Sequence, residues 1–227
     1  SVYILDFSYP RDVLEALNAR VDTLVVLDHH KTAQEDLKDL PYAIFDMNKS
    51  GAVLAWEFFF PTEPVPKILT RVQDRDLWRW QYKDTRDVLN SLEMAKDDFS
   101  VWDWAEQNFE KAAAEGLRVS EYKAMKVEEA CDPQNFLRRT FMGYQVAIMN
   151  SSAHMTSEVG NKVVTENSDI DIFIGYSILP NGRVYLSFRS AGIDTTPLAR
   201  HFGGGGHAKA SGALTSLDVL KEFYDTP

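Results

Sequence analysis

The chain has 227 residues, of which 44% are hydrophobic and 26% are charged, as is usual for a folded globular protein. Its formal net charge of −10 argues against a nucleic-acid-binding protein of the kind that holds long DNA or RNA through clustered Lys and Arg. A small anionic substrate stays compatible with this charge, because a divalent metal ion supplies positive charge locally. No apolar run approaches the roughly 18 residues of a membrane span, and the start has no signal-peptide pattern. With Cys131 as the single cysteine we expect no disulfide framework and a cytoplasmic protein.

Apolar strands alternate with helical patterns over the first 60 residues. The expected strands are 2–5, 23–27 and 43–45, and the expected helices are 10–17, 32–40 and 51–60. Ser50 is a suitable N-cap for the last of these helices. Strands that alternate with helices favour a parallel sheet in an α/β domain.

From residue 64 the pattern is almost wholly helical, up to a break at 131–134, after which strands return. The expected strands are 136–141, 145–149, 170–179 and 183–189, and the expected helices are 155–167 and a short one between Thr195 and Gly203. Pro180-Asn181-Gly182 is a good hairpin turn between two of the strands. We therefore predict two domains, 1–133 and 134–227. The first has a parallel sheet and a helical insert at 85–130, and the second is a smaller α/β domain with a mixed sheet.

The sharpest chemical signal is Asp28-His29-His30, which directly follows the buried run 23–27. Residues at the carboxyl end of a parallel strand face the crevice where α/β folds bind ligands. An Asp and two His placed there are natural ligands for a divalent metal ion, so we expect a catalytic metal site. The alternative is a pair of surface histidines in a loop. Asp6 follows the strand 2–5, so we expect it at the same sheet edge. The alternative is that Asp6 caps a helix.

A second acidic pair, Asp74 and Asp76, follows the expected helix 67–73. These carboxylates either join the site or form a salt-bridged helix end. Trp78 and Trp80 come directly after them, and we interpret both as core residues in preference to a surface on which bases stack.

The second domain carries a glycine run in which Gly204, Gly205 and Gly206 precede His207. Consecutive glycines let backbone N–H groups approach a phosphate closely, and His207 is able to hydrogen-bond a phosphate or a base. We therefore expect these four residues to bind substrate, with a flexible linker as the alternative. Arg189 ends an expected strand, where it either binds phosphate bidentately or is an ordinary surface residue.

In this order, the motifs resemble those of the DHH superfamily of phosphoesterases with its associated C-terminal domain, a group that includes nanoRNases and RecJ-like exonucleases. The Asp28-His29-His30 motif resembles the one that names the family, 203–207 resembles its glycine-rich motif, and 187–190 resembles its Arg-bearing strand. The likeness extends from residue 6 to residue 212. It implies an active site in a cleft between the two domains.

The resemblance also implies two divalent ions, usually Mn²⁺, with Mg²⁺ as the alternative. By this resemblance, Asp6 would bridge the two ions, and His29 and Asp74 would bind one of them. Asp28 would support the site or act as a ligand, and His30 would contact a metal ion or a substrate phosphate. Two such ions turn water into hydroxide and offset charge on the transferring phosphoryl group. The arginine and the glycine-rich segment would hold the rest of the substrate.

One motif of the family has no counterpart here, an Asp-x-Asp pair on a strand before the one that carries Asp6. The chain begins in what reads as a strand, so we expect that an upstream segment carries the pair. The alternative is a degenerate family member. The pairs Asp74/Asp76 and Asp169/Asp171 have the spacing but lie elsewhere.

Together these signals predict a metal-dependent phosphoesterase that hydrolyses small nucleotides, such as phosphoadenosine phosphate, or short oligonucleotides as an exonuclease. The alternatives are a catalytically degenerate nucleotide-binding module and a polyphosphate or pyrophosphate hydrolase. The acidic charge favours short substrates over long duplexes, and RNA, DNA and mononucleotides stay open. The aromatic cluster at 56–60 is either core or an interface, and an interface there would make the protein a homodimer.

Overall fold

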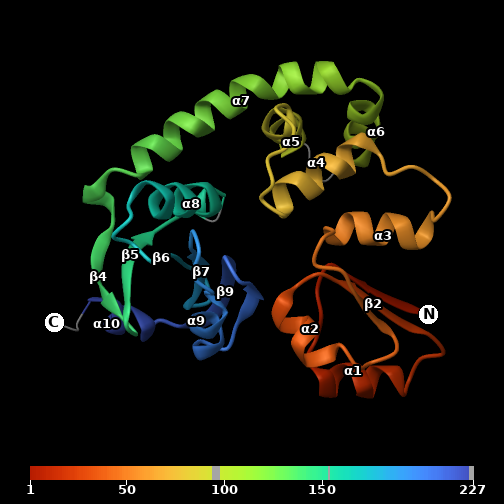
Figure 1. Ribbon diagram of the computed structural model, residues 1–227, viewed down its shortest axis with the longest axis horizontal. Coiled ribbons are helices and arrows are strands. Elements are labelled where there is room, and N and C mark those ends of the chain that lie inside the picture. The colour runs from red at the N-terminus through yellow and green to blue at the C-terminus, as the bar shows by residue number, and fades with distance from the viewer. Residues whose placement is uncertain (94–97, 153, 225–227) are drawn as a thin grey trace. The chain divides into compact units, whose positions relative to one another are not determined.

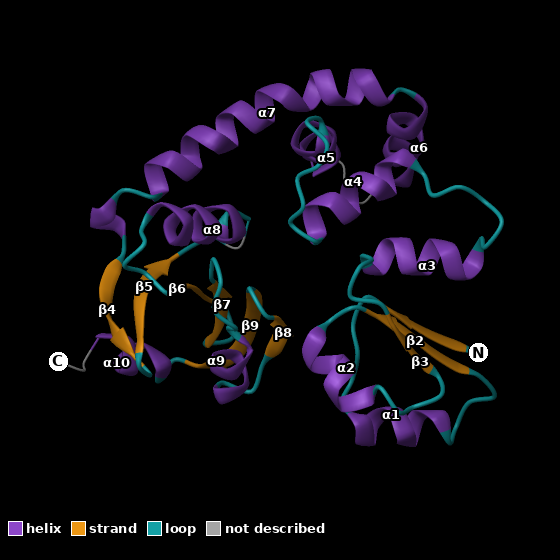
Figure 2. Ribbon diagram, viewed as in Figure 1, coloured by secondary structure: helices purple, strands orange, loops and turns teal. Residues whose placement is uncertain are grey.

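The computed structural model describes residues 1–93, 98–152 and 154–224. The chain divides into two compact units, Ser1–Ala124 and Met125–Pro227, and each has its own sheet (Figures 1 and 2). The predicted fold class is confirmed, since one sheet has three parallel strands and the other has six strands in mixed orientation. The assignment of domains to 1–133 and 134–227 stays a prediction.

The sheet of the first unit has β2 at its centre, between β1 and β3. Its strands are β1 (Val2–Leu5), β2 (Leu24–Asp28) and β3 (Ala43–Phe45), and its helices are α1 (Arg11–Asn18), α2 (Lys31–Leu37) and α3 (Gly51–Phe59). Leu14 of α1 and Leu37 of α2 pack with Val26 in one buried cluster. The helix α3 contacts β1 and β2 from the other face (Figure 1). Covering both faces of β2 explains why its sequence is a continuous apolar run.

Among the described residues between α3 and residue 131, there are four more helices. They are α4 (Lys67–Asp76), α5 (Thr85–Glu93), α6 (Phe99–Gln107) and α7 (Phe109–Ala130). Ile68 of α4, Leu89 of α5 and Ala105 of α6 share a buried cluster, so these helices form a second core within the unit. The helix α4 continues three residues past its predicted end and includes Asp74 and Asp76. Residues 94–97 of the predicted insert 85–130 lie outside the described residues.

The second unit is built on a sheet of order β4-β5-β6-β7-β9-β8, in which only β5 and β6 are parallel neighbours. The strands are β4 (Leu137–Phe141), β5 (Tyr144–Asn150), β6 (Ile172–Ile178), β7 (Arg183–Arg189), β8 (Gly205–His207) and β9 (Ala210–Ser216). The predicted turn at Pro180-Asn181-Gly182 is confirmed, because it joins the antiparallel strands β6 and β7.

Helices cover both faces of this second sheet. They are α8 (Thr156–Glu166), α9 (Thr196–His201) and α10 (Val219–Tyr224), and a short 3₁₀ turn, η1 (Pro133–Asn135), precedes β4. Val163 of α8 packs with Phe173, whereas Leu198 of α9 and Phe223 of α10 pack with Ile174 on the opposite face. Consecutive strand residues point to opposite faces, so β6 supplies both cores. Among the described helices, none combines the length and hydropathy that crossing a membrane requires.

Candidate metal centre

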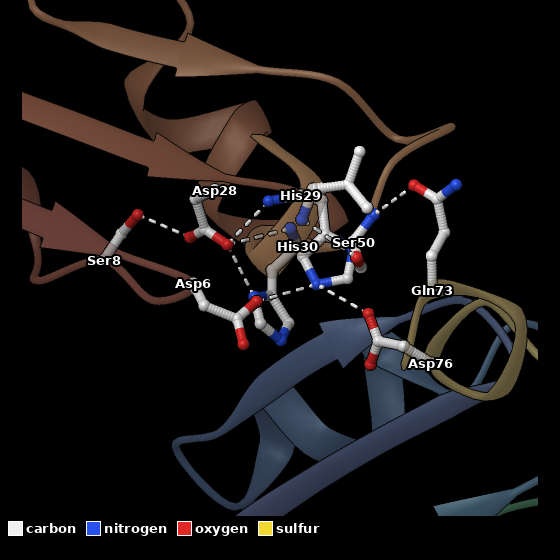
Figure 3. Close-up of polar contacts among 9 residues, drawn as sticks. Asp6, Ser8, Asp28, His29, His30, Ser50, Gln73 and Asp76 are labelled. Carbon is white, nitrogen blue, oxygen red and sulfur yellow. Dashed lines mark hydrogen bonds and ion pairs between the residues drawn. The ribbon is translucent and has the colours of Figure 1, made fainter. Parts of the chain in front are cut away.

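Three segments from different parts of the first unit meet at His29, the residue after β2. The ring of His29 is 1% exposed, and its Nε2 lies 3.0 Å from Oδ1 of Asp6 and 3.3 Å from Oδ2 of Asp76 (Figure 3). Asp6 follows β1, and Asp76 is the last residue of α4. The carboxyl ends of parallel strands share one sheet edge, which explains why Asp6 and His29 lie together.

The spacing at His29 suits a divalent cation. Neighbouring ligands on an octahedral ion with bonds of about 2.1 Å lie about 3 Å apart. The pair of Asp6 with His29 has this separation, and so does the pair of Asp76 with His29. Imidazole nitrogen and carboxylate oxygen are also ligands that Mn²⁺ and related ions accept. The residues present therefore fit the metal that the resemblance implies.

Asp28 is fully buried and its carboxylate is occupied by hydrogen bonds. Oδ1 accepts from the backbone N–H of His29 at 2.7 Å and of His30 at 3.2 Å, and it lies 2.6 Å from Nδ1 of His30. Oδ2 accepts from the hydroxyl of Ser8 at 2.5 Å (Figure 3). These contacts fix the His30 ring and leave Asp28 in a supporting position.

The contact between Asp28 and His30 shifts the pKa of both groups. Burial raises the pKa of Asp28, but hydrogen bonds from His30 and Ser8, with the charge of His30, outweigh it and leave this pKa lowered. The hydrogen bond to Asp28 raises the pKa of His30, although burial opposes it. Each partner therefore stabilises the charged form of the other.

The two carboxylates near the end of α4 have different surroundings. Asp74 is 2% exposed and accepts hydrogen bonds from Gln81 N at 2.8 Å, Tyr82 N at 3.3 Å and Thr85 Oγ1 at 2.6 Å. Residues two apart on a helix point about 200° apart, so Asp76 points away from these donors. The structure thus brings Asp76 to His29, where the family resemblance assigned a ligand role to Asp74.

These environments also shift the pKa of the two carboxyl groups. Burial raises the pKa of Asp74, but the bonds from Thr85, Gln81 and Tyr82 outweigh it and leave the pKa lowered. Burial raises the pKa of Asp76, and the opposing charge of His29 does not cancel this. Asp74 is thus a satisfied structural anion, whereas Asp76 is an anion that a nearby cation would stabilise.

The start of α3 lies beside the centre (Figure 3). Ser50 caps this helix by accepting from Val53 N at 3.3 Å, and its own N–H donates to Oε1 of Gln73 on α4 at 3.1 Å (Figure 3). Asp6 has a left-handed backbone with φ of 68°, a conformation that Asp tolerates better than most residues. Ser8 and Gln73 were not predicted to have roles here, and Asp76 was predicted only as one of an acidic pair that either joins the site or ends a helix.

Arg189, in the second unit, has its guanidinium held by neutral acceptors. Nη1 donates to the carbonyl of Phe188 at 2.8 Å, and Nη2 donates to Oγ of Ser157 at 2.8 Å. Burial lowers the pKa of Arg189. Within the described residues this cation has no carboxylate in salt-bridge contact, so it is suited to an anionic ligand.

The glycine run forms the edge of the second sheet. Gly205, Gly206 and His207 are the strand β8, which pairs antiparallel with β9. A Cβ on Gly204 would overlap the carbonyl oxygen of Gly212, so close approach of the two segments requires glycine there. This packing gives Gly204 a structural role, and the phosphate contacts predicted for the run stay predictions.

Comparisons with known proteins add relatives that cover nearly the whole chain. No protein-family model matches it. It is 32% identical over 225 residues to the uncharacterized protein R106 of Acanthamoeba polyphaga mimivirus. That alignment covers 95% of this chain and 53% of R106. It is 25% identical over 255 residues to oligoribonuclease NrnB of Bacillus subtilis, and this alignment covers 98% of the chain and 61% of NrnB. The chain therefore spans only 53% and 61% of the lengths of these relatives.

Among solved structures, a pGpG-specific phosphodiesterase, PggH, from Vibrio cholerae matches 97% of this chain and 87% of its own. The sequence identity is 13% and the TM-score is 0.45.

Proposed function

We propose that this chain, which belongs to the DHH superfamily of phosphoesterases, is the metal-binding part of a hydrolase for short oligonucleotides or small nucleotides. The observation that carries the proposal is His29 Nε2, which lies at metal-ligand spacing from two carboxylates. The similarity to an oligoribonuclease over 98% of the chain supports the same class of substrate.

The proposed ligands of the divalent ions are Asp6, His29 and Asp76, with Asp76 in place of Asp74. Mn²⁺ is the ion we propose, and Mg²⁺ is the alternative. When bound, such ions supply an activated water and offset negative charge on the phosphoryl group. Asp28 holds Nδ1 of His30, so the opposite ring nitrogen of His30 is proposed to donate to a substrate phosphate oxygen.

The second unit is proposed to contribute phosphate-binding groups. Arg189 is a desolvated cation that Ser157 holds in place, and desolvation strengthens its attraction to a phosphate. Gly204, Gly205, Gly206 and His207 are proposed to contact the substrate as well. The net charge of −10 repels long polyanions, which favours substrates of a few nucleotides.

Hydrolysis assays with Mn²⁺ test this function. The substrates are RNAs of increasing length from a dinucleotide, phosphoadenosine phosphate, and inorganic polyphosphate as the alternative substrate class. We expect hydrolysis of the shortest RNAs or of phosphoadenosine phosphate, with loss of activity in His29→Ala and retention in Asp12→Ala, a change on the exposed face of α1.

Two other results would redirect the assignment. Equal hydrolysis by the wild type and His29→Ala would reject the proposed metal site. Nucleotide binding without hydrolysis, weakened by Arg189→Ala, would identify a binding module on an enzyme fold.

A further inference from the structure

Gly51, the first residue of α3, lies directly against the side chain of Asp6. A Cβ added to Gly51 would come within 3.0 Å of Oδ1, Cβ and Cγ of Asp6, closer than real Cβ atoms approach other heavy atoms. These three atoms are also its nearest neighbours. No side chain fits at position 51 while Asp6 keeps its place.

The backbone at this position gives no other reason for glycine. Left-handed glycines occur at positions 143, 182, 203 and 206, and Gly51 is not among them. Glycine is also a weaker helix former than alanine, and Gly51 is the first residue of a helix that Ser50 already caps. Glycine at position 51 is therefore explained by the space that the Asp6 side chain occupies.

The crowded atom of Asp6 is the one that matters at the metal centre. Oδ1, the atom nearest to the added Cβ, is also the atom 3.0 Å from Nε2 of His29. Asp6 holds this orientation from a left-handed backbone. A small shift of its side chain therefore changes the distance between two proposed ligands.

We propose that Gly51 is a positioning residue of the metal centre, which leaves room for the Asp6 carboxylate at ligand distance from His29. This inference rests on the proposed function, because it takes Asp6 and His29 to be metal ligands. Gly51 has no part in binding the ion itself, so its effect must pass through Asp6.

A double-mutant cycle between Gly51→Ala and Asp6→Gly tests this dependence. Asp6→Gly removes all three crowding atoms and tolerates the left-handed backbone. The first readout is the dissociation constant for Mn²⁺, measured by calorimetry. We expect Gly51→Ala to weaken binding at least tenfold in the wild type, and to cause no further loss in the Asp6→Gly background.

The second readout is the thermal unfolding midpoint in EDTA, which requires no metal. Gly51→Ala lowers the midpoint in the wild type, because the methyl group collides with Asp6. In the Asp6→Gly background the same change leaves the midpoint equal or raises it, because alanine is the better helix former. Should the single variant fail to fold, recovery of folding in the double variant reports the same collision.

Gly192→Ala is the matched control. It adds the same methyl group at an exposed position where no atom lies within 4 Å, so Mn²⁺ affinity and midpoint should match the wild type. Wild-type Mn²⁺ affinity in Gly51→Ala, or an equal loss in both backgrounds, would overturn the inference. If the wild type itself binds no Mn²⁺, the proposed function fails and the metal role of Gly51 fails with it. The thermal unfolding midpoints of Gly51→Ala in the wild-type and Asp6→Gly backgrounds would then still show whether Asp6 and residue 51 collide.

Discussion

Oδ1 of the buried Asp28 lies 2.6 Å from Nδ1 of His30, and each residue holds the other in its charged form. The carboxyl pKa is lowered, so its stabilising effect is present above an unfolded pKa of about 3.9 and is lost as pH falls. The imidazole pKa is raised, so its effect is complete below an unfolded pKa of about 6.5 and is lost as pH rises through the folded value. The pair therefore stabilises the fold most between these limits.

Asp28→Asn should lower the pKa of His30, since the variant removes the negative partner that raises it. An NMR titration of the His30 ring measures this shift. The stability advantage of the wild type over the variant should be greatest in the mildly acidic range and shrink above it. Asp12→Asn on the exposed face of α1 is the control, and an unchanged His30 titration in Asp28→Asn would disprove the coupling.

Ser8→Ala should reduce the free energy of unfolding by about 1–2 kcal/mol, because Oδ2 of the buried Asp28 loses its hydroxyl donor. Urea denaturation followed by circular dichroism measures this. Ser100→Ala, at an exposed position in the first turn of α6, is a suitable comparison. A Ser8→Ala variant as stable as the wild type would show that the hydroxyl does not support Asp28.

Asp74→Asn and Asp76→Asn should have opposite effects. Asp74→Asn places an amide group among N–H donors, so it should cost about 2 kcal/mol of unfolding free energy while Mn²⁺ still binds. Asp76→Asn should weaken Mn²⁺ binding with little loss of stability. Urea denaturation and Mn²⁺ calorimetry on both variants separate the roles. Loss of Mn²⁺ binding in a folded Asp74→Asn variant, with normal binding in Asp76→Asn, would restore the ligand role to Asp74.

Cys131 should react slowly with thiol reagents in the folded protein. Burial raises the pKa of its thiol to about 11, so little thiolate exists at pH 8. Reaction with Ellman's reagent should be on the order of a hundredfold slower than in urea-unfolded protein, and it should accelerate as pH approaches that pKa. Equal rates in folded and unfolded protein would contradict the burial of this thiol.

Local sequence patterns predicted the strand framework well. The apolar run at 23–27 indicated a strand buried on both faces, and β2 runs from Leu24 to Asp28. The strand β9 (Ala210–Ser216) was not predicted, and neither was the three-residue strand β8, in which Gly205 and Gly206 are weak strand formers. The strand β8 forms because β9 supplies a neighbouring strand to pair with.

The detail of the candidate site depends on contacts that local patterns do not record. Choosing between Asp74 and Asp76 requires the end and the rotation of α4, and the predicted end at Gln73 was three residues early. The space that Gly51 leaves for Asp6 joins α3 to the end of β1, and only the folded chain brings these together.

His29 is proposed to bind a divalent ion together with Asp6 and Asp76, and calorimetric titration of the wild type and His29→Gln with Mn²⁺ measures this binding. We expect saturable Mn²⁺ binding by the wild type and at least a tenfold weaker association in His29→Gln, with both proteins folded. Equal Mn²⁺ affinity in the two proteins would show that His29 is not a metal ligand.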